Sequence, residues 1–372
     1  MTNKQDKIFG TGSIVLIVLI GLGVLVALIR YLFGLGAITN LSDAYPWGIW
    51  ISFDLLCGVA LAAGAFVVAA VVHIFGGKTM KPLLRPAILT GFLGYILVVL
   101  ALLVDLGQYH RIWHLTIHWN FHSPLFEVGW CVMLYLTVLA LEFAPNVLER
   151  YNLQAPLRIL KRISIVLIIA GIVLSTMHQS SLGTLFLIMP YKLHQLWHTP
   201  LLPVFFLISA IAVGIAMVIF ESTLAMKFYK KEPETVAQGK LAIGLPWVLG
   251  IYFIMKIADL AAQGEIGLMF DGSKASYLFL LEMIIGVVIP FFYFISKSVR
   301  QSTKAMYNGS LFVIAGLILN RFNVSLFGIS APKTASYFPH IMEFMITIGI
   351  VSAGILAYYL LTRFFPVIAE EH

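Results

Sequence analysis

The sequence predicts an all-α polytopic membrane protein, and three features support this fold class. Of 372 residues, 60% are hydrophobic and only 11% are charged, whereas soluble domains carry about 25% charged residues. The mean hydropathy is +0.95. Apolar runs long enough to cross roughly 30 Å of hydrocarbon as a helix recur along the chain. Soluble globular, disordered, collagen-like and coiled-coil classes are therefore excluded.

The apolar runs predict one integral membrane domain, residues 1–372, with about ten transmembrane helices. Proline inside two runs, at Pro246 and Pro290, is tolerated because neighbouring helices satisfy the freed carbonyls. The first run follows a short basic tail without a cleavage motif, so we expect it to remain as an anchor. The expected spans are 12–33, 50–75, 83–106, 124–143, 163–187, 201–224, 241–262, 277–296, 309–328 and 341–365.

Basic residues are distributed unequally between alternate loops. The two termini and the even-numbered loops together hold seventeen Lys and Arg residues, whereas the odd-numbered loops hold four, namely Arg111, Lys192, Lys274 and Lys333. Because cytoplasmic loops are enriched in Lys and Arg, both termini are expected in the cytoplasm. The odd-numbered loops then face the opposite, periplasmic side. This bias also explains the net charge of +7 without a nucleic-acid partner.

Ionisable residues within the expected spans are candidates for function, because each costs at least about 2.5 to 3.5 kcal/mol on insertion scales. Most lie toward the outer ends, which predicts a polar site opening to the outer face. The outer set is Arg30, Asp54, Asp105, Glu127, His178, Lys256, Asp259, Glu282, Arg321 and Glu343, and the inner set is His73, Glu142 and Glu221.

Structural roles compete with functional ones for several of these residues. Lys256 and Asp259 are three residues apart on one helix and can neutralise each other. Arg321 needs a partner in lipid, and either Asp259 or Glu282 could supply it. Helix capping or interfacial solvation can explain the acids nearest the span ends, namely Asp105, Glu282 and Glu343.

We expect no haem, iron–sulfur cluster or metal in this chain. The only cysteines, Cys57 and Cys131, lie in separate apolar runs and form no cluster motif. A haem between helices needs facing axial ligands, but His73 lies near the inner surface and His178 in the outer half. Four outer-loop histidines are interleaved with tryptophans, which favours an interfacial helix or docking surface over a metal site. They are His110, His114, His118 and His122.

The sequence contains no nucleophile elbow, P-loop, HExxH motif or Rossmann fingerprint. The chemistry is therefore expected to come from a ligand dissolved in the membrane lipid or from a partner subunit docked on one face.

Local strings along nearly the whole chain resemble the NrfD/polysulfide reductase membrane-subunit family, and within it the membrane subunits of hydrogenases. The most specific are Leu141–Pro145 (LEFAP) and Thr176–Ser181 (TMHQSS). The others are Phe33–Gly36, Tyr45–Gly48, Phe53–Leu56, Arg85–Ala87, Gly94–Tyr95, Asp105–Gly107, Leu125–Glu127, Phe220–Glu221 and Tyr337–Pro339.

The resemblance implies NrfD-like four-helix bundles in a bacterial inner membrane and a quinone-reactive anchor without a redox centre of its own. A periplasmic ferredoxin-like iron–sulfur subunit would pass electrons between the small and large subunits of a [NiFe] hydrogenase and menaquinone. The quinone would bind in the outer half of the membrane, where the charged residues gather. Proton transfer could accompany this reaction.

The resemblance also assigns residues. Glu127 and Tyr95 match positions linked to quinone chemistry and its protons, and Asp54 and His178 match polar positions of the bundle interior. Such groups can deliver the two protons that quinone reduction requires. Tyr95 can instead hydrogen-bond a quinone carbonyl or merely satisfy the backbone. Further candidates are Asp105 and Arg30 near the quinone, Trp47 as a pocket wall, Glu142, Glu221 and His73 on a proton pathway, and Lys256, Asp259 and Arg321 in the polar interior.

Two alternatives remain open at this stage. The same membrane fold could serve another periplasmic oxidoreductase, of the polysulfide or nitrite type. A proton-coupled secondary transporter is the third hypothesis. Such folds usually show inverted repeats and paired broken helices, and the sequence has only acids at the outer ends of the fourth, eighth and tenth spans as a weak sign of them.

Overall fold

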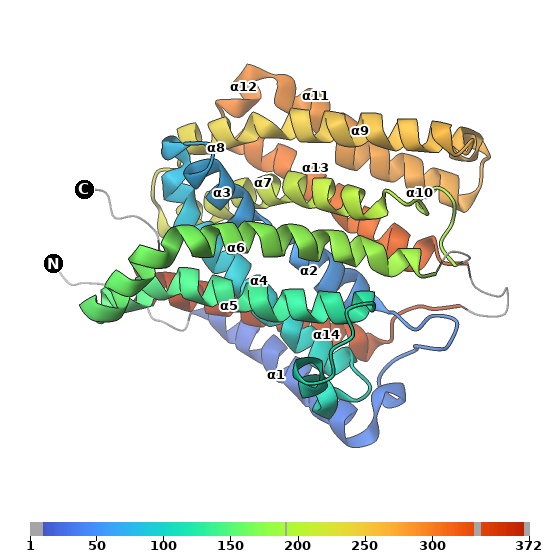
Figure 1. Ribbon diagram of the computed structural model, residues 1–372, viewed down its shortest axis with the longest axis horizontal. Coiled ribbons are helices and arrows are strands. Elements are labelled where there is room, and N and C mark those ends of the chain that lie inside the picture. Colours follow the sequence, from blue (N-terminus) through green and yellow to red (C-terminus); the bar gives the residue numbers. More distant parts are fainter. Residues whose placement is uncertain (1–9, 190–191, 331–335, 368–372) are drawn as a thin grey trace.

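The computed structural model describes residues 10–189, 192–330 and 336–367, and these residues form helices and connecting loops with no β-strand (Figure 1). The expected all-α class is confirmed. The helices are α1 Thr11–Phe33, α2 Leu56–Leu61, α3 Gly64–His73, α4 Leu84–Asp105, α5 Pro124–Arg150, α6 Gln154–Leu187, α7 Leu202–Tyr229, α8 Thr235–Ala242, α9 Gly244–Ala262, α10 Lys274–Met283, α11 Ile289–Ile295, α12 Lys297–Arg300, α13 Thr303–Phe322 and α14 Ile341–Phe364.

Nine helical runs within the described residues are long and apolar enough to cross a membrane, and they coincide with nine expected spans. The remaining expected span, 163–187, falls within α6, a 34-residue helix that lies between α5 and α7 (Figure 1). Helices α5, α6 and α7 extend beyond the apolar runs by several residues. The sequence marks only the part of a helix that lies in hydrocarbon, whereas backbone hydrogen bonding continues into its polar ends.

The spans form two groups. The first bundle consists of the run Trp50–His73 with α4, α5 and α6, and the second bundle consists of α7, α9, α13 and the run Lys274–Ile295. Helix α7 of the second bundle also packs against the first bundle, while α1 and α14 pair with each other and flank the first bundle through α4 (Figure 1).

The run Trp50–His73 is the centre of the first bundle. Within its most apolar window 78% of the residues are buried, compared with 11% for α1. It is also irregular, because a π-helical segment, Trp50–Leu55, precedes α2 and α3. Close packing on α7 requires Gly214, since a Cβ there would lie 3.0 Å from the backbone of Ala63 and Gly64. Small residues at such contacts let membrane helices approach closely.

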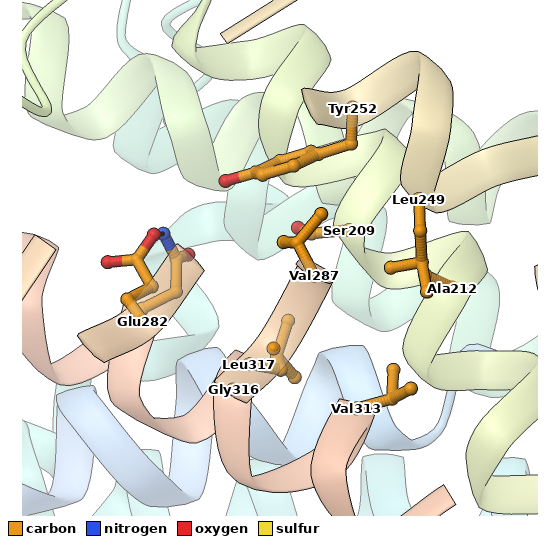
Figure 2. Close-up of a pocket in the computed structure, with 11 residues that line it drawn as sticks. Ser209, Ala212, Leu249, Tyr252, Glu282, Val287, Val313, Gly316 and Leu317 are labelled. Atoms are coloured by element: carbon orange, nitrogen blue, oxygen red, sulfur yellow. Dashed lines mark hydrogen bonds between the residues drawn. The ribbon is translucent and has the colours of Figure 1, made fainter. Parts of the chain in front are cut away.

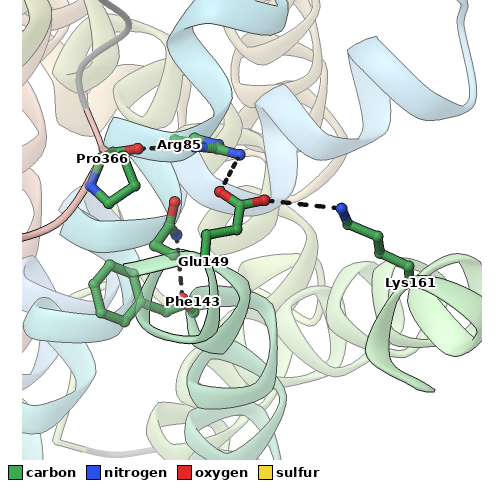
Figure 3. Close-up of polar contacts among 6 residues, drawn as sticks. Arg85, Phe143, Glu149, Lys161 and Pro366 are labelled. Carbon is green, nitrogen blue, oxygen red and sulfur yellow. Dashed lines mark hydrogen bonds and ion pairs between the residues drawn. The ribbon is translucent and has the colours of Figure 1, made fainter. Parts of the chain in front are cut away.

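Charged residues tie three helices together at the end of the molecule where α1 begins and α14 ends. Glu149 of α5 accepts from Arg85 of α4 at 2.9 Å and pairs with Lys161 of α6 at 3.9 Å (Figure 3). Arg85 also donates to the carbonyl of Pro366, directly after α14, at 2.8 Å. These exposed pairs each contribute at most about 1 kcal/mol. They show that basic residues of two even-numbered loops gather at the end shared by the first and last helices.

Candidate functional site

A buried tyrosine–histidine pair lies in the first bundle. The Tyr95 hydroxyl on α4 and Nδ1 of His178 on α6 are hydrogen-bonded at 2.9 Å, and both side chains are 0% exposed. The ring of Tyr135 from α5 stands edge-on to Tyr95, with centroids 4.7 Å apart. His178 Nε2 has no hydrogen-bond partner among the described residues, and Ser175 faces the hydroxyls of Tyr95 and Tyr135. Buried polar groups left unpaired are costly, so this arrangement is a candidate for function.

Glu127 reaches the same region from the N-terminal end of α5. It sits in the first turn of the helix, after the N-cap Ser123, where the helix dipole favours a carboxylate. Its Oε1 accepts from the Ser181 hydroxyl at 2.6 Å. Ser181 follows His178 by less than one turn on α6, and Glu127 is only half-buried. Glu127 is therefore the less buried group, next to the enclosed tyrosine–histidine pair.

We name Glu127, Ser181, His178, Tyr95 and Tyr135 the first-bundle cluster. Glu142 lies at its inner end: a Cβ placed on Gly171 would be 3.5 Å from Glu142 Oε1 and 3.7 Å from the Tyr135 ring. Glu142 and Glu127 therefore lie on opposite sides of the Tyr95–His178 pair along α5. Because Tyr95 is enclosed and bonded to His178, its geometry fits a relay rather than a direct contact with a quinone carbonyl.

Asp54 and Arg30 lie in separate environments. Asp54, in the π-helical segment, accepts from the Thr347 hydroxyl of α14 at 2.7 Å. Arg30 of α1 donates through Nε to the Val104 carbonyl at 2.7 Å and through Nη2 to the Leu106 carbonyl. It therefore caps the C-terminal end of α4, beside the half-buried Asp105. None of these residues contacts the first-bundle cluster through a hydrogen bond or ion pair among the described residues.

Trp47 is half-buried and stands edge-on to Phe186 of α6, with centroids 5.4 Å apart. It also lines a small cavity, of about 10 Å³, together with Met189 and Ile329. Its place at the outer end of α6 is compatible with the expected pocket wall.

The inner candidates do not form one group. Glu221 of α7 faces the hydroxyls of Thr90 on α4 and Tyr358 on α14. His73 is exposed at the end of α3.

His73 and His178 do not form a pair of haem ligands. His73 ends α3 at the surface, whereas His178 is enclosed deep in α6 and uses one ring nitrogen for Tyr95.

The expected pairing in the second bundle is wrong. Lys256 and Asp259 form no ion pair within the described residues: the Lys256 ammonium lies over the Phe205 ring at 4.9 Å, and Asp259 accepts from the Thr199 hydroxyl at 2.9 Å. Arg321 likewise has no direct carboxylate partner there. It donates to Asn320 at 2.6 Å, and Asn320 in turn donates to Glu282 at 2.7 Å. Asp259 and Arg321 thus find neutral partners on neighbouring residues, Thr199 and Asn320, which the spacing of Lys256 and Asp259 does not reveal.

Several partners were not anticipated from the sequence. Tyr135 and Ser181 belong to the first-bundle cluster, and Thr347 binds Asp54. One signal was available: Glu127, Tyr135 and Glu142 recur at spacings of eight and seven residues, which places them on one face of a helix.

The chain matches the family described as polysulphide reductase, NrfD, over residues 37–331. An Escherichia coli protein named probable Ni/Fe-hydrogenase 2 b-type cytochrome subunit is 33% identical over 91% of this chain and 88% of its own. A Nitratidesulfovibrio vulgaris protein is 40% identical over 99% of this chain and 97% of its own. The menaquinone reductase integral membrane subunit of the same organism is 28% identical over 91% of this chain and 87% of its own. The resemblance noted in the sequence, including that to the hydrogenase-2 subunit, is confirmed, and the chain belongs to the NrfD family of multi-pass membrane proteins.

Proposed function

We propose that this chain is the quinone-reactive membrane anchor of a periplasm-facing [NiFe] hydrogenase. A ferredoxin-like iron–sulfur subunit on the outer face supplies electrons from the hydrogenase small and large subunits, and menaquinone bound in the outer half of the inner membrane accepts them. The observation that carries the proposal is the half-buried Glu127 above the enclosed Tyr95–His178 pair. The names of two relatives support it, because one is a Ni/Fe-hydrogenase subunit and the other a menaquinone reductase subunit.

The chemistry follows from the accessibility of each group. Reducing a quinone to a quinol takes two electrons and two protons, and Glu127 is the acid that a quinone head group can reach. Ser181 joins Glu127 to α6 at 2.6 Å, and His178, Tyr95 and Tyr135 continue inward toward Glu142. The first-bundle cluster would reprotonate Glu127 after each turnover. Glu221 and His73 would admit protons from the cytoplasmic side.

The chain's two cysteines lie on different helices, and both are free and buried. The relative's designation as a b-type cytochrome implies a haem, which His73 and His178 do not fit as a pair. No electron-transfer step is therefore assigned to a haem in this chain, and electrons would pass from the external cluster to quinone.

The test is Glu127→Gln in the purified complex. Glutamine can still accept the hydrogen bond from Ser181 but cannot donate a carboxylic proton. Because general acid catalysis contributes about 10²-fold to 10⁴-fold, hydrogen-dependent reduction of a menaquinone analogue should fall by at least about tenfold. Reduction of a soluble dye should stay within about twofold. Glu232→Gln, on the exposed connection between α7 and α8, is the matched control. Unchanged quinone reduction in Glu127→Gln would remove this residue from the mechanism.

The same role in another oxidoreductase is the second candidate, favoured by the menaquinone reductase subunit among the relatives. The proteins that copurify with the chain distinguish the two. Copurification of the hydrogenase small and large subunits would support the first candidate. Copurification of a different catalytic subunit, in a complex that reduces quinone, would support the second candidate instead.

A further inference from the structure

The second bundle contains a group of buried charges that the proposed quinone chemistry does not use. Lys256, Asp259, Glu282 and Arg321, here named the second-bundle cluster, come from α9, α10 and α13, and none is more than 9% exposed. Two positive and two negative charges balance formally. Charged side chains at this depth are costly in a membrane and mark functional sites by default.

A cavity of about 30 Å³ adjoins the cluster between α7, α9, α13 and the run Lys274–Ile295. Four polar residues, Ser209, Tyr252, Glu282 and Asn320, line it together with apolar side chains (Figure 2). A cavity needs about 10 to 15 Å³ and two to four polar partners to hold a water molecule. This cavity meets both conditions.

The hydrogen bonds of Glu282 distinguish it from the other groups. Its carboxylate accepts from Trp197 at 3.0 Å, from Asn323 at 2.7 Å and from Asn320 at 2.7 Å. Three donors hold the carboxyl group in one orientation. The Tyr252 hydroxyl, although only 6% of the residue is exposed, has no hydrogen-bond partner among the described residues, and it points toward the side of the cavity where Glu282 lies (Figure 2).

Lys256 lies on α9 between Tyr252, which lines this cavity, and the C-terminal end of the helix. It follows Tyr252 by four residues and precedes Asp259 by three, so the three side chains share one face of the helix. Its ammonium lies 4.9 Å from the Phe205 ring centroid and 5.8 Å from that of Phe279. Within the described residues it makes neither a hydrogen bond nor an ion pair. One oxygen of Asp259, a single turn from the end of α9 at Ala262, also lacks a partner there.

The side chains around the cavity suit a water molecule and a proton better than a metal ion. Hard cations take six or more oxygen ligands, but both Glu282 oxygens already accept N–H donors. Arg321 and Lys256 add positive charge nearby. A water molecule can use the Tyr252 hydroxyl and the remaining lone pairs, and a proton needs only one acceptor at a time.

We propose that the second bundle contains a hydrated protonation site, in which water in this cavity links Tyr252 to Glu282 and the Lys256 amine exchanges a proton with it. In the forward step a hydronium ion transfers its proton to the neutral amine, giving an ammonium group and water. In the release step the ammonium group transfers its proton to the Asp259 carboxylate, which leaves a neutral amine and a carboxylic acid near the C-terminal end of α9. This site is distinct from the first-bundle cluster, and its hydration does not depend on the proposed quinone reaction.

Radiolytic hydroxyl-radical labelling of the purified protein tests the hydration, because buried side chains next to bound water become oxidised. Tyr252 should be labelled about tenfold faster than Tyr95, which is 0% exposed and bonded to His178. Ala212→Val, which adds two methyl groups to the cavity wall, should abolish the difference. Equal labelling of Tyr252 and Tyr95 in the unmodified protein would overturn the proposal.

Proton uptake in vesicles containing the complete complex tests the role of Lys256. Lys256→Met should keep quinone reduction within about twofold and lower the number of protons taken up per electron, whereas Lys304→Met, on the exposed start of α13, should change neither. An unchanged proton count in Lys256→Met would refute proton exchange at this site. If the unmodified complex reduces no quinone, the proposed function fails instead, and the labelling result still decides whether the cavity is hydrated.

Discussion

At the scale of single residues, the acidic side chains differ in how many hydrogen-bond donors they have. Glu343 is 0% exposed and fully bonded: it accepts from the backbone of Asn40 at 3.0 Å, from His340 at 2.8 Å and from the Tyr337 hydroxyl at 2.5 Å. It completes a capping box at the start of α14, so the structural explanation offered for this residue is confirmed. Glu127 has one side-chain partner and access to the surface. The number of donors therefore separates a structural acid from a candidate for chemistry.

The tyrosine–histidine pair gives the first prediction. Tyr95→Phe removes the hydroxyl bonded to His178 and leaves both ring nitrogens of that histidine without a partner. We expect quinone-linked turnover to fall by about tenfold or more, because general acid–base relays contribute on this scale, while dye-linked turnover persists. Both rates should be measured on the purified complex.

Tyr229→Phe is the matched control for this change. It also removes a tyrosine hydrogen bond, to Thr362 at 2.6 Å, but at the opposite end of the molecule and outside the cluster. An equal fall in quinone-linked turnover for the two variants would point to general destabilisation rather than to a relay.

Tyr337, in the segment before α14, gives a prediction for stability. Its hydroxyl donates to Glu343 and accepts from the Ile49 backbone at 3.1 Å. Burial, followed by the hydrogen bond to Glu343, raises the pKa of the phenol above its ordinary value of 10.0. Tyr337→Phe leaves two buried groups without this partner, which costs about 1 to 3 kcal/mol for each unsatisfied group. The change should appear in thermal unfolding in detergent.

The sign of the shift fixes the pH range of this contribution. A phenol whose pKa is higher in the folded state stabilises the fold fully below its unfolded pKa of about 10, and the effect disappears as the pH rises through the folded value. The difference between the wild type and Tyr337→Phe should thus be constant from about pH 6 to about pH 9. A difference that disappears within this range would contradict the assignment.

At the scale of elements, three π-helical segments interrupt the spans, and each lies beside a buried charge. Trp50–Leu55 contains Asp54, Ile284–Val288 follows Glu282, and Asn323–Phe327 follows Arg321. An extra residue in the turn shifts the following side chains and leaves irregular hydrogen bonding, and such bulges occur frequently at functional sites. The irregular turns thus accompany buried charged residues of both bundles.

The contact between Gly286 and Gly316 gives the prediction at this scale. A Cβ on Gly316 would overlap the Cα of Gly286, so Gly316→Ala must push α13 away from the π-helical segment. Overpacking of this kind typically costs about 1 to 3 kcal/mol. We expect a lower midpoint of thermal unfolding. Gly12→Ala, where a Cβ would meet nothing within 4 Å, should be neutral or slightly stabilising. Equal midpoints for the two variants would show that the helices do not meet closely.

At the scale of the whole molecule, the two bundles share α7 and carry separate polar clusters. The ion pairs of Arg85, Glu149 and Lys161 lie at the end shared by the start of α1 and the end of α14 (Figure 3). Glu127 belongs to the opposite end, at the start of α5. Under the proposed function, electrons would arrive at the face near Glu127, and protons would enter at the face near the Arg85–Glu149–Lys161 ion pairs. The length of the bundle would then separate the two.

Orientation in the membrane is the prediction at this scale. Cysteines placed at Arg111 or Lys274 should react with an impermeant maleimide in intact spheroplasts, because these positions lie in odd-numbered loops. Cysteines at Lys297 or Lys304 should react only after permeabilisation. The native Cys57 and Cys131 are buried and should give little background. The opposite labelling pattern would invert the proposed direction of electron entry.

Local sequence was enough to locate the spans, the unequal basic loops and the family. An apolar run of about 20 residues predicts a membrane helix whatever surrounds it, so no knowledge of the packing is needed. The strings shared with the family also placed Glu127, Tyr95 and His178 among the candidates.

Which of these residues meet depends on the packing of the helices. The hydrogen bond between Tyr95 and His178 joins residues 83 apart, and that between Ser181 and Glu127 joins residues 54 apart. Nearly continuous apolar runs offer too little contrast between polar and apolar sides to show which face of a helix turns inward. The Lys256–Asp259 pairing failed for a related reason, because spacing brings two residues to one face but does not show whether neighbouring helices offer them better partners.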